Sequence, residues 1–110
     1  MKKGEVWSID LPSSSRSEQM GSMPSVIKTE ADANIAIIIP FSSNVQALRY
    51  TNTIFVELSV QNGLKSDSII LVFQIRAIDK HRILNKLGEL EEEYITKVDK
   101  MLMDMLKLSK

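Results

Sequence analysis

Few side chains in this sequence belong to the types that carry out metal or nucleophilic chemistry. The 110 residues include no cysteine and one histidine, His81, so thiolate and multi-histidine metal sites are excluded. His81 stands between Lys80 and Arg82, and a solvated surface histidine is favoured there over a catalytic one. The sequence has no phosphate-binding glycine loop and no serine elbow of the hydrolase type. We therefore expect neither a metal nor an organic cofactor.

A polar segment at residues 12–19, with the sequence PSSSRSEQ, contains a dense group of side chains that could bind a ligand. It is rich in serine and long for a hairpin connection. Exposed connections often carry binding and catalytic residues, so this segment is a candidate functional loop. The alternative is a disordered hairpin tip without function, and both interpretations agree with the composition.

Five segments have the composition and spacing of the strands that would position this loop. They are residues 5–11, 25–29, 35–41, 53–59 and 68–75. The third is continuously apolar, as expected for a strand buried on both faces, and the fourth alternates, with Ile54, Val56 and Leu58 on one face. Asn62 and Gly63 predict a turn, because both residue types accept positive φ.

The apolar spacing changes to that of a helix near the C-terminus. One stripe is predicted from apolar residues at 87, 90, 94, 98, 101, 105 and 108. Acidic residues precede it and Lys107 and Lys110 follow it, as the helix dipole favours, and Glu93 is spaced to pair with Lys97. We expect the stripe to pack on the chain's own sheet, with a partner or membrane surface as the alternative. Strands followed by one helix predict a single domain over residues 1–110, with a largely antiparallel sheet or small barrel.

The overall composition, 44% hydrophobic and 25% charged, is that of a folded protein. Fourteen basic and fourteen acidic residues leave no net charge, so a nucleic-acid role would require locally clustered cations. The longest apolar run, residues 35–39, is too short to span a bilayer, and the first residues lack the apolar region of a signal peptide. We therefore expect a cytoplasmic protein without membrane contacts.

Six segments resemble, in identity, order and spacing, the MazF/PemK family of toxins. They are GEVW at 4–7, SEQ at 17–19, Pro24, IPFSS at 39–43, GLKSDS at 63–68 and QIRAIDK at 74–80. This resemblance extends from residue 4 to about residue 105. It implies a mainly β fold with a C-terminal helix, the small SH3-like β-barrel of MazF/PemK/CcdB-like toxins, assembled as a homodimer. It also implies metal-independent, sequence-specific cleavage of single-stranded mRNA, with a small antitoxin protein that blocks the RNA groove.

The chemistry implied by the resemblance is attack of a ribose 2′-hydroxyl on the adjacent phosphorus. That reaction requires a base, an acid and donors for the charged phosphorane. Ser42 corresponds to the family's strand-end threonine, and Glu18 to its loop glutamate. The expected catalytic residues are therefore Ser42, Glu18 and Arg76. The expected RNA-binding residues are Arg16, Ser17, Gln19, Ser43 and Gln74.

Key positions depart from the family pattern. Met23 stands where the family has its catalytic arginine, immediately before the proline of the first loop. Phe73 and Leu71 replace an acid and an arginine that some PemK-like members use. Loss of one charge-stabilising donor lowers a rate by about 10²–10³-fold, so we expect weakened activity unless Arg16 or Arg76 substitutes. Met23 agrees both with natural drift and with a change made to inactivate a toxic protein.

Each expected role has a simpler alternative. Ser42 could only cap a strand end, Glu18 could be a solvated carboxylate, and Arg76 could pair with a nearby acid. For the whole chain, one alternative is a non-catalytic MazF-like protein that binds RNA or an antitoxin-like peptide. Another is a relative that poisons a different target, such as gyrase. Met23 and Phe73 favour the non-catalytic alternative, whereas Glu18, Ser42 and the retained QIR segment favour the ribonuclease.

Overall fold

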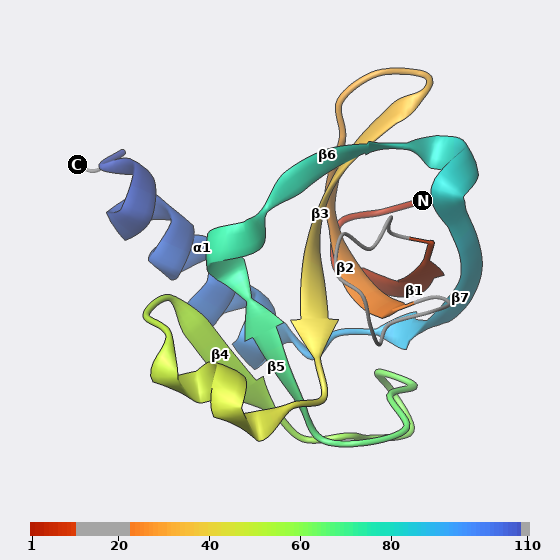
Figure 1. Cartoon of the computed structure of the whole chain (residues 1–110). Helices are drawn as coiled ribbons and strands as arrows, with labels where there is room; N and C mark the ends of the chain where they lie inside the picture. Colours follow the sequence, from red (N-terminus) through yellow and green to blue (C-terminus); the bar gives the residue numbers. More distant parts are fainter. Residues whose placement is uncertain (11–22, 109–110) are drawn as a thin grey trace.

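The computed structural model describes residues 1–10 and 23–108 of the chain (Figure 1). Its strands and α-helix are β1 (Glu5–Ile9), β2 (Met23–Glu30), β3 (Ile35–Ser42), β4 (Thr53–Val56), β5 (Ser68–Leu71), β6 (Arg76–Asp79), β7 (Ile83–Glu89) and α1 (Glu92–Leu106). Three short 3-10 helices connect them: η1 (Val45–Arg49), η2 (Val72–Gln74) and η3 (Lys80–Arg82).

The strands form one antiparallel sheet in the order β4-β5-β3-β2-β1-β7, and β3 is its centre. One edge of β3 pairs with β2. Along the other edge, residues 35–38 pair with β6, whereas Phe41 and Ser42 pair with β5. The sheet curves strongly (Figure 1), but within the described residues its end strands β4 and β7 do not pair with each other. The predicted mainly β fold with a C-terminal helix is confirmed, and the expected barrel is an open one.

Side chains of β3 enter two apolar clusters, because the strand is covered on both faces. Ile39 and Phe41 belong to the larger cluster, which also contains Val98 and Leu102 of α1. Ile38 points to the opposite face and packs in a smaller cluster with residues of β1, β2 and β6. Successive residues of a strand point to opposite faces, so a strand buried on both sides needs an unbroken apolar run. The prediction for this strand is confirmed.

The C-terminal apolar stripe packs against the sheet through one face of α1, as predicted. Val98 and Leu102 are buried in the larger cluster, and Tyr94 packs against it. Leu87, which the stripe included, lies instead in β7, and the helix ends before Lys107, whose φ is 58°. No helix of the described ranges is long and apolar enough to cross a membrane.

An ionic cluster fastens α1 to the first two strands. The Asp99 carboxylate accepts hydrogen bonds from Lys28 and, at 2.8 Å, from Lys3. Burial would raise the pKa of Asp99, but the hydrogen bonds from the two lysines lower it, and the carboxylate stays ionised. The expected Glu93–Lys97 pair is not among the ion pairs of the described residues. The Lys97 ammonium lies 5.9 Å from the centre of the tyrosine ring of α1.

The fourth expected strand is shorter than its alternating pattern predicted. It ends at Val56, and Leu58 is 49% exposed although it continues the apolar face. The Leu58 N–H donates to the Asp67 carboxylate at 3.0 Å instead of to a neighbouring strand. Side-chain acceptors of this kind compete with strand pairing, and they end a strand whatever its periodicity.

Two strands, β6 and β7, were not predicted. The expected strand at 68–75 stops at Leu71, and η2 turns the chain before β6 begins. Leu84 and Leu87 of β7 and Leu90 just after it recur every three residues, a spacing that resembles the start of the helix. Gly88 shows why the segment is extended. A Cβ there would lie 2.3 Å from the carbonyl oxygen of Gln61, so the strand approaches that loop more closely than a side chain allows.

Candidate active-site groove

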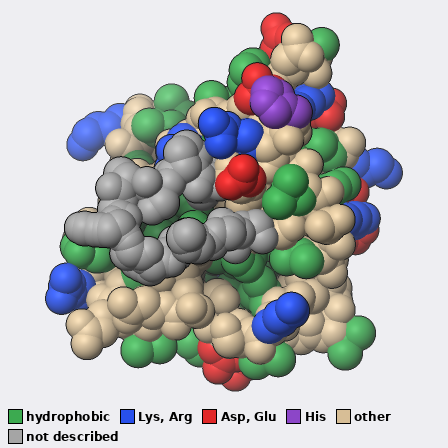
Figure 2. Space-filling view, turned by 45° about the vertical axis from the view of Figure 1, so that its right-hand side comes forward, with side chains coloured by type: hydrophobic (Ala, Val, Ile, Leu, Met, Phe, Trp, Pro, Cys, Tyr) green, Lys and Arg blue, Asp and Glu red, His purple; other side chains and the backbone are tan. Residues whose placement is uncertain are grey.

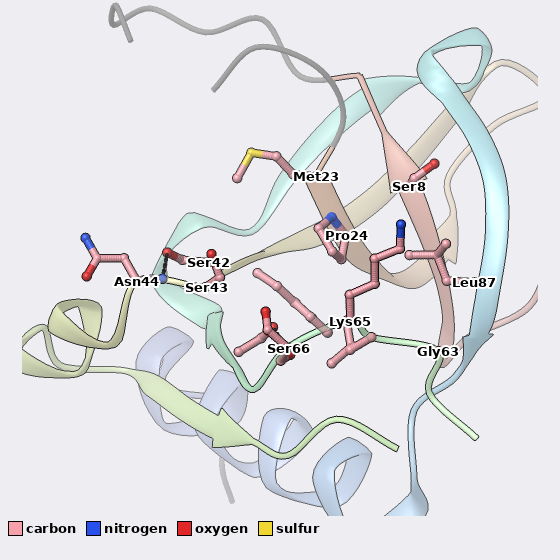
Figure 3. A pocket seen from close by; sticks show the side chains of 13 residues that line it. Ser8, Met23, Pro24, Ser42, Ser43, Asn44, Gly63, Lys65, Ser66 and Leu87 are labelled. Carbon is pink, nitrogen blue, oxygen red and sulfur yellow. Dashed lines mark hydrogen bonds between the residues drawn. The ribbon is translucent and has the colours of Figure 1, made fainter. Parts of the chain in front are cut away.

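A groove of about 720 Å³ opens beside the C-terminal end of β3 (Figure 3). Its described lining includes five serines, which are Ser8, Ser42, Ser43, Ser66 and Ser68. Its apolar lining comes mainly from Met23, Pro24, Phe41, Leu64 and Leu87. Hydroxyl donors around an apolar floor suit a ligand that combines anionic and planar groups, and the volume lies in the usual range of ligand pockets, about 300–1,000 Å³.

Ser42 is the last residue of β3 and lines the groove. Its Oγ accepts a hydrogen bond from the Asn44 N–H at 3.0 Å, and the Asn44 side chain accepts one from the Gln46 N–H at 2.9 Å, which starts η1. Ser42 therefore does cap the strand end, as the simpler interpretation held. Because its oxygen accepts that bond, its own proton remains available to donate to a ligand in the groove.

Met23 faces Ser42 across the β2–β3 pair. The register pairs Ser25 with Pro40, and continuing it by two residues sets Met23 opposite Ser42. Both residues line the groove, and Figure 3 shows the Met23 side chain on the same side of the strands as Ser42. The position where MazF/PemK toxins have an arginine is therefore adjacent to the position of their threonine, but here it supplies no charge and no donor.

Lys65 is the one Lys or Arg in the described lining of the groove, and sequence reasoning missed it. Figure 3 shows its side chain extending from the loop before β5 into the hollow. The available signal was the lysine of the GLKSDS segment together with the uncharged Met23, because a site that loses one cation needs another to hold an anion.

The buried side chain of Asn62 anchors the loop that carries Lys65. It is fully buried, and its side-chain oxygen accepts from the Ser59 and Leu64 N–H groups, each at 3.0 Å. Its amide donates to the Glu57 carbonyl at 3.0 Å and to the Glu91 carboxylate at 3.1 Å. A buried amide with all of these partners satisfied is a rigid anchor.

Gly63 lets the same loop approach β7. Its φ is 71°, which favours glycine, and a Cβ would lie 1.9 Å from the Leu87 carbonyl oxygen. The predicted Asn62–Gly63 turn is confirmed, although only Gly63 has positive φ. Together these two residues fix the backbone from which Lys65 enters the groove.

The other predicted site residues are not all gathered here. Ser43 lines the groove, and Gln74 lines a smaller hollow of about 230 Å³ that shares Ser42 and Asn44 with it. Arg76 is exposed on β6, pairs with Ile38, and lines neither hollow, so the structure does not bring it to Ser42.

The remaining predicted residues are Arg16, Ser17, Glu18 and Gln19, which lie outside the described residues.

His81 lies on the surface, as the sequence predicted. The His81 side chain is 80% exposed, and its Nδ1 lies 2.7 Å from the Asp79 carboxylate. Figure 2 shows Lys and Arg side chains spaced apart over the visible face rather than gathered in one patch. Affinity for an anion in the described part of the groove therefore depends on Lys65 and on hydroxyl and backbone donors.

Comparison with known proteins places the chain in a family. Residues 2–106 match the family described as the PemK-like, MazF-like toxin of type II toxin–antitoxin systems. The chain belongs to this family. Among its relatives, endoribonuclease EndoA of Bacillus subtilis is 31% identical over 112 residues, which cover 98% of this chain and 96% of EndoA.

Solved structures show the same fold at lower identity. MazF of Deinococcus radiodurans in its Form I has a TM-score of 0.77 and 16% identity, with 98% of this chain and 97% of that chain covered. A MazE–MazF structure of Deinococcus radiodurans has a TM-score of 0.74 and 19% identity, with 99% and 97% covered. A mycobacterial endoribonuclease in complex with its cognate antitoxin has a TM-score of 0.68 and 16% identity, with 98% and 94% covered. This MazF-like toxin therefore has the predicted toxin fold.

Leu71 and Phe73 stand where the resemblance predicts an arginine and an acid of some PemK-like members. Leu71 is buried in a small apolar cluster with Ala47 and Ile69, so that position contributes to packing rather than to charge. Phe73 is 38% exposed and lines the smaller hollow. The two positions thus hold apolar side chains in different surroundings. Leu71 packs in an apolar cluster, whereas Phe73 is partly exposed in the smaller hollow.

Proposed function

We propose that this MazF-like toxin is a sequence-specific endoribonuclease that cleaves single-stranded mRNA in the groove beside Ser42, without a metal ion. The observation that carries the proposal is the groove itself, whose described lining combines Ser42, Ser43 and Ser66 with one cation, Lys65. A phosphate needs such donors together with positive charge. The relationship to endoribonuclease EndoA supports RNA as the substrate.

The proposed reaction uses the nucleophile of the substrate. The ribose 2′-oxygen forms a bond to the adjacent phosphorus, and the bond from phosphorus to the 5′-oxygen of the next nucleotide breaks. The 2′-hydroxyl proton passes to a base, for which Glu18 is the candidate, and the leaving oxygen takes a proton from an acid. Ser42 donates to a non-bridging phosphate oxygen, and Lys65 offsets the charge that accumulates on the phosphorane.

In this scheme Lys65, rather than Arg76, supplies the positive charge that an arginine at position 23 would provide. Arg76 lines neither hollow, whereas Lys65 extends into the groove. A lysine is a single-point cation and lacks the two-pronged donor geometry of an arginine. We therefore expect cleavage that is real but weaker than that of a toxin with arginine at position 23.

The deciding experiment is cleavage of a mixed-sequence RNA by the purified protein in the presence of EDTA. Fragments should end in 2′,3′-cyclic phosphate at a short recurring sequence, and a single 2′-deoxy substitution at the cleaved position should abolish the cut. Ser42→Ala should lower the rate about 10²–10³-fold, as expected for one lost donor. Ser42→Thr, which keeps the hydroxyl, is the matched control. Equal rates for Ser42→Ala and wild type would contradict the assignment.

Met23 and Phe73 favour a second candidate function, a non-catalytic member of the family that binds RNA or an antitoxin-like peptide. This candidate predicts that the protein binds RNA lacking a free 2′-hydroxyl and cleaves none. It further predicts that Met23→Arg does not restore cleavage. The two functions therefore separate in one assay series, because the ribonuclease proposal requires cuts in at least the Met23→Arg protein.

The proposal includes a small antitoxin partner, a homodimer and a cytoplasmic location. Solved MazE–MazF and endoribonuclease–antitoxin structures support the antitoxin. Exposed apolar side chains of Val45, Leu48 and Phe55 support self-association, because a second copy would cover them. Light scattering at micromolar concentration should give the mass of a dimer, and a monomer would contradict that part.

A further inference from the structure

Two aromatic side chains stand in the smaller hollow, next to the groove. Tyr50 is 49% exposed and Phe73 is 38% exposed, and their ring centres lie 5.6 Å apart at an angle of 48°. The Arg49 guanidinium lies 5.1 Å from the centre of the Tyr50 ring and donates to its hydroxyl at 3.2 Å. We call Arg49, Tyr50 and Phe73 the aromatic platform. Exposed rings of this size lose contact with water on binding, so they are a source of binding free energy.

The platform is held rigid by hydrogen bonds from the backbone. The Phe73 N–H donates to the Asn52 carbonyl at 3.3 Å, which joins the two segments that carry the rings. The Thr53 hydroxyl donates to the Tyr50 carbonyl at 3.0 Å, and Asn52 has a φ of 62°. A surface that is ordered before binding loses little conformational entropy when it binds.

Polar groups border the rings and join the platform to the groove. The amide of Gln74 and the residues Ser42 and Asn44 line the same hollow as Tyr50 and Phe73. Ser42 and Asn44 also line the larger groove. The hollow, about 230 Å³, is smaller than the range of about 300–1,000 Å³ typical of drug-sized ligands, so it suits a single planar fragment.

We propose, resting on the ribonuclease function above, that the aromatic platform binds one unpaired nucleobase of the RNA, next to the phosphate held at Ser42. Single-stranded RNA is bound by stacking of its bases on aromatic rings and guanidinium planes, with hydrogen bonds to the exposed base edges. The platform offers two rings and a guanidinium, and Gln74 lines the same hollow. A phosphate at Ser42 would place an adjoining nucleotide at the platform, because Ser42 belongs to both hollows.

The test measures equilibrium binding of fluorescent 2′-O-methyl RNA oligonucleotides, which cannot supply the attacking hydroxyl. The sequences are those around the mapped cleavage site or, without cleavage, a mixed-sequence pool. Wild type is compared with Tyr50→Ala and Phe73→Ala. The matched control is Leu84→Ala, because Leu84 is 47% exposed on β7 and lines neither hollow. Thermal unfolding of every variant verifies that it is folded.

Each platform variant should bind about 5- to 150-fold more weakly than wild type, which corresponds to the loss of one stacked base. The dependence of binding on salt should keep its slope, because no phosphate contact is removed. If the bases of the oligonucleotide are removed one position at a time, wild type should lose the same amount of affinity at one position and not at the others. Removal of the base at that position should not weaken binding to the Phe73→Ala protein any further.

The outcomes separate this inference from the ribonuclease proposal. If wild type binds or cleaves RNA and the platform variants bind as tightly as Leu84→Ala, the platform is not a base site, although the ribonuclease proposal survives. If the platform variants convert a dimer into monomers, a second copy of the chain occupies this face and the inference is overturned. If wild type neither binds nor cleaves any RNA, both are overturned.

Discussion

At the scale of single residues, the decisive pair is Met23 and Ser42, which line the same groove and which a continued β2–β3 register would set opposite each other. The hydroxyl is retained and capped so that its proton is free to be donated, but the side chain opposite it has no charge. Under the proposed function, the groove would bind a phosphate with one donor missing and with one cation, Lys65, supplied by another loop.

Met23→Arg should raise the rate of RNA cleavage about 10²–10³-fold. A guanidinium opposite Ser42 would donate to the same phosphate as the phosphorane forms. Initial rates on a single-site RNA measure the change. Met23→Leu is the control, since it keeps an apolar side chain of similar volume and should leave the rate unchanged. If Met23→Arg only tightens binding without faster cleavage, then position 23 does not act in the transition state.

Lys65→Gln should weaken RNA binding and reduce its salt dependence. Neutralising one phosphate contact lowers the slope of log affinity against log salt by about 0.7 for a single strand. Titrations at several salt concentrations give this slope. The control is Lys100→Gln, an exposed lysine of α1 that lines neither hollow and should leave the slope unaltered. An unchanged slope in Lys65→Gln would remove this lysine from the phosphate site.

At the scale of elements, α1 is held to the rest of the chain at its start and in its middle. The residue that follows its last turn, Lys107, has a strained backbone conformation. Glu91 accepts hydrogen bonds from Ser59 and Asn62 at the start, and Asp99 binds Lys3, which precedes β1, and Lys28 of β2. At the end, Lys107 adopts the left-handed conformation, and its N–H and that of Leu108 close the last turn. A side chain in that conformation costs about 1–2 kcal/mol.

Lys107→Gly should stabilise the protein by about 1 kcal/mol, because glycine adopts the left-handed conformation without that cost. Urea unfolding followed by circular dichroism measures the free energy of unfolding. Lys100→Gly, in the middle of α1, should instead destabilise by about 1 kcal/mol. Destabilisation by both changes would mean that the end of the helix is not capped as described.

At the scale of the whole molecule, half-buried ionised carboxylates hold distant parts of the chain together. Burial would raise the pKa of Glu5, but the Lys2 N–H, the Trp7 indole N–H and Lys86 donate to its carboxylate and lower the pKa to about 2. The contact with Lys86, at 3.2 Å, joins β1 to β7 at the last pairing of the sheet order. A carboxyl group with a lowered pKa stabilises the fold above its unfolded value near 4.5, and this stabilisation is lost as pH falls toward 2.

Glu5→Gln should therefore lower the free energy of unfolding at pH 7, by about 1.5–3 kcal/mol for lost charge-assisted hydrogen bonds. The difference from wild type should shrink between pH 4.5 and pH 2 and disappear near the lower end, where wild-type Glu5 takes up its proton. Urea titrations at a series of pH values measure it. Glu93→Gln, an exposed change on α1, should show no such dependence. A difference that stays constant to pH 2 would contradict the role of Glu5.

The sequence predicted the architecture better than the site, for a physical reason. β3 and α1 have long apolar patterns that only one kind of burial satisfies, so their segments were predicted correctly. β7 was missed because its contact with Gln61 depends on tertiary approach at Gly88. Lys65 was missed for the same reason, since the buried Asn62 anchor that directs its loop joins residues far apart in sequence.

The opposition of Met23 and Ser42 also bears on how such a gene could change. The methionine codon AUG and the arginine codon AGG differ at one base. If a guanidinium beside Ser42 restores full cleavage, a mild toxin and a potent one are separated by a single substitution that alters no core residue and no strand pairing. Selection could then move a population between the two strengths without passing through an unfolded protein.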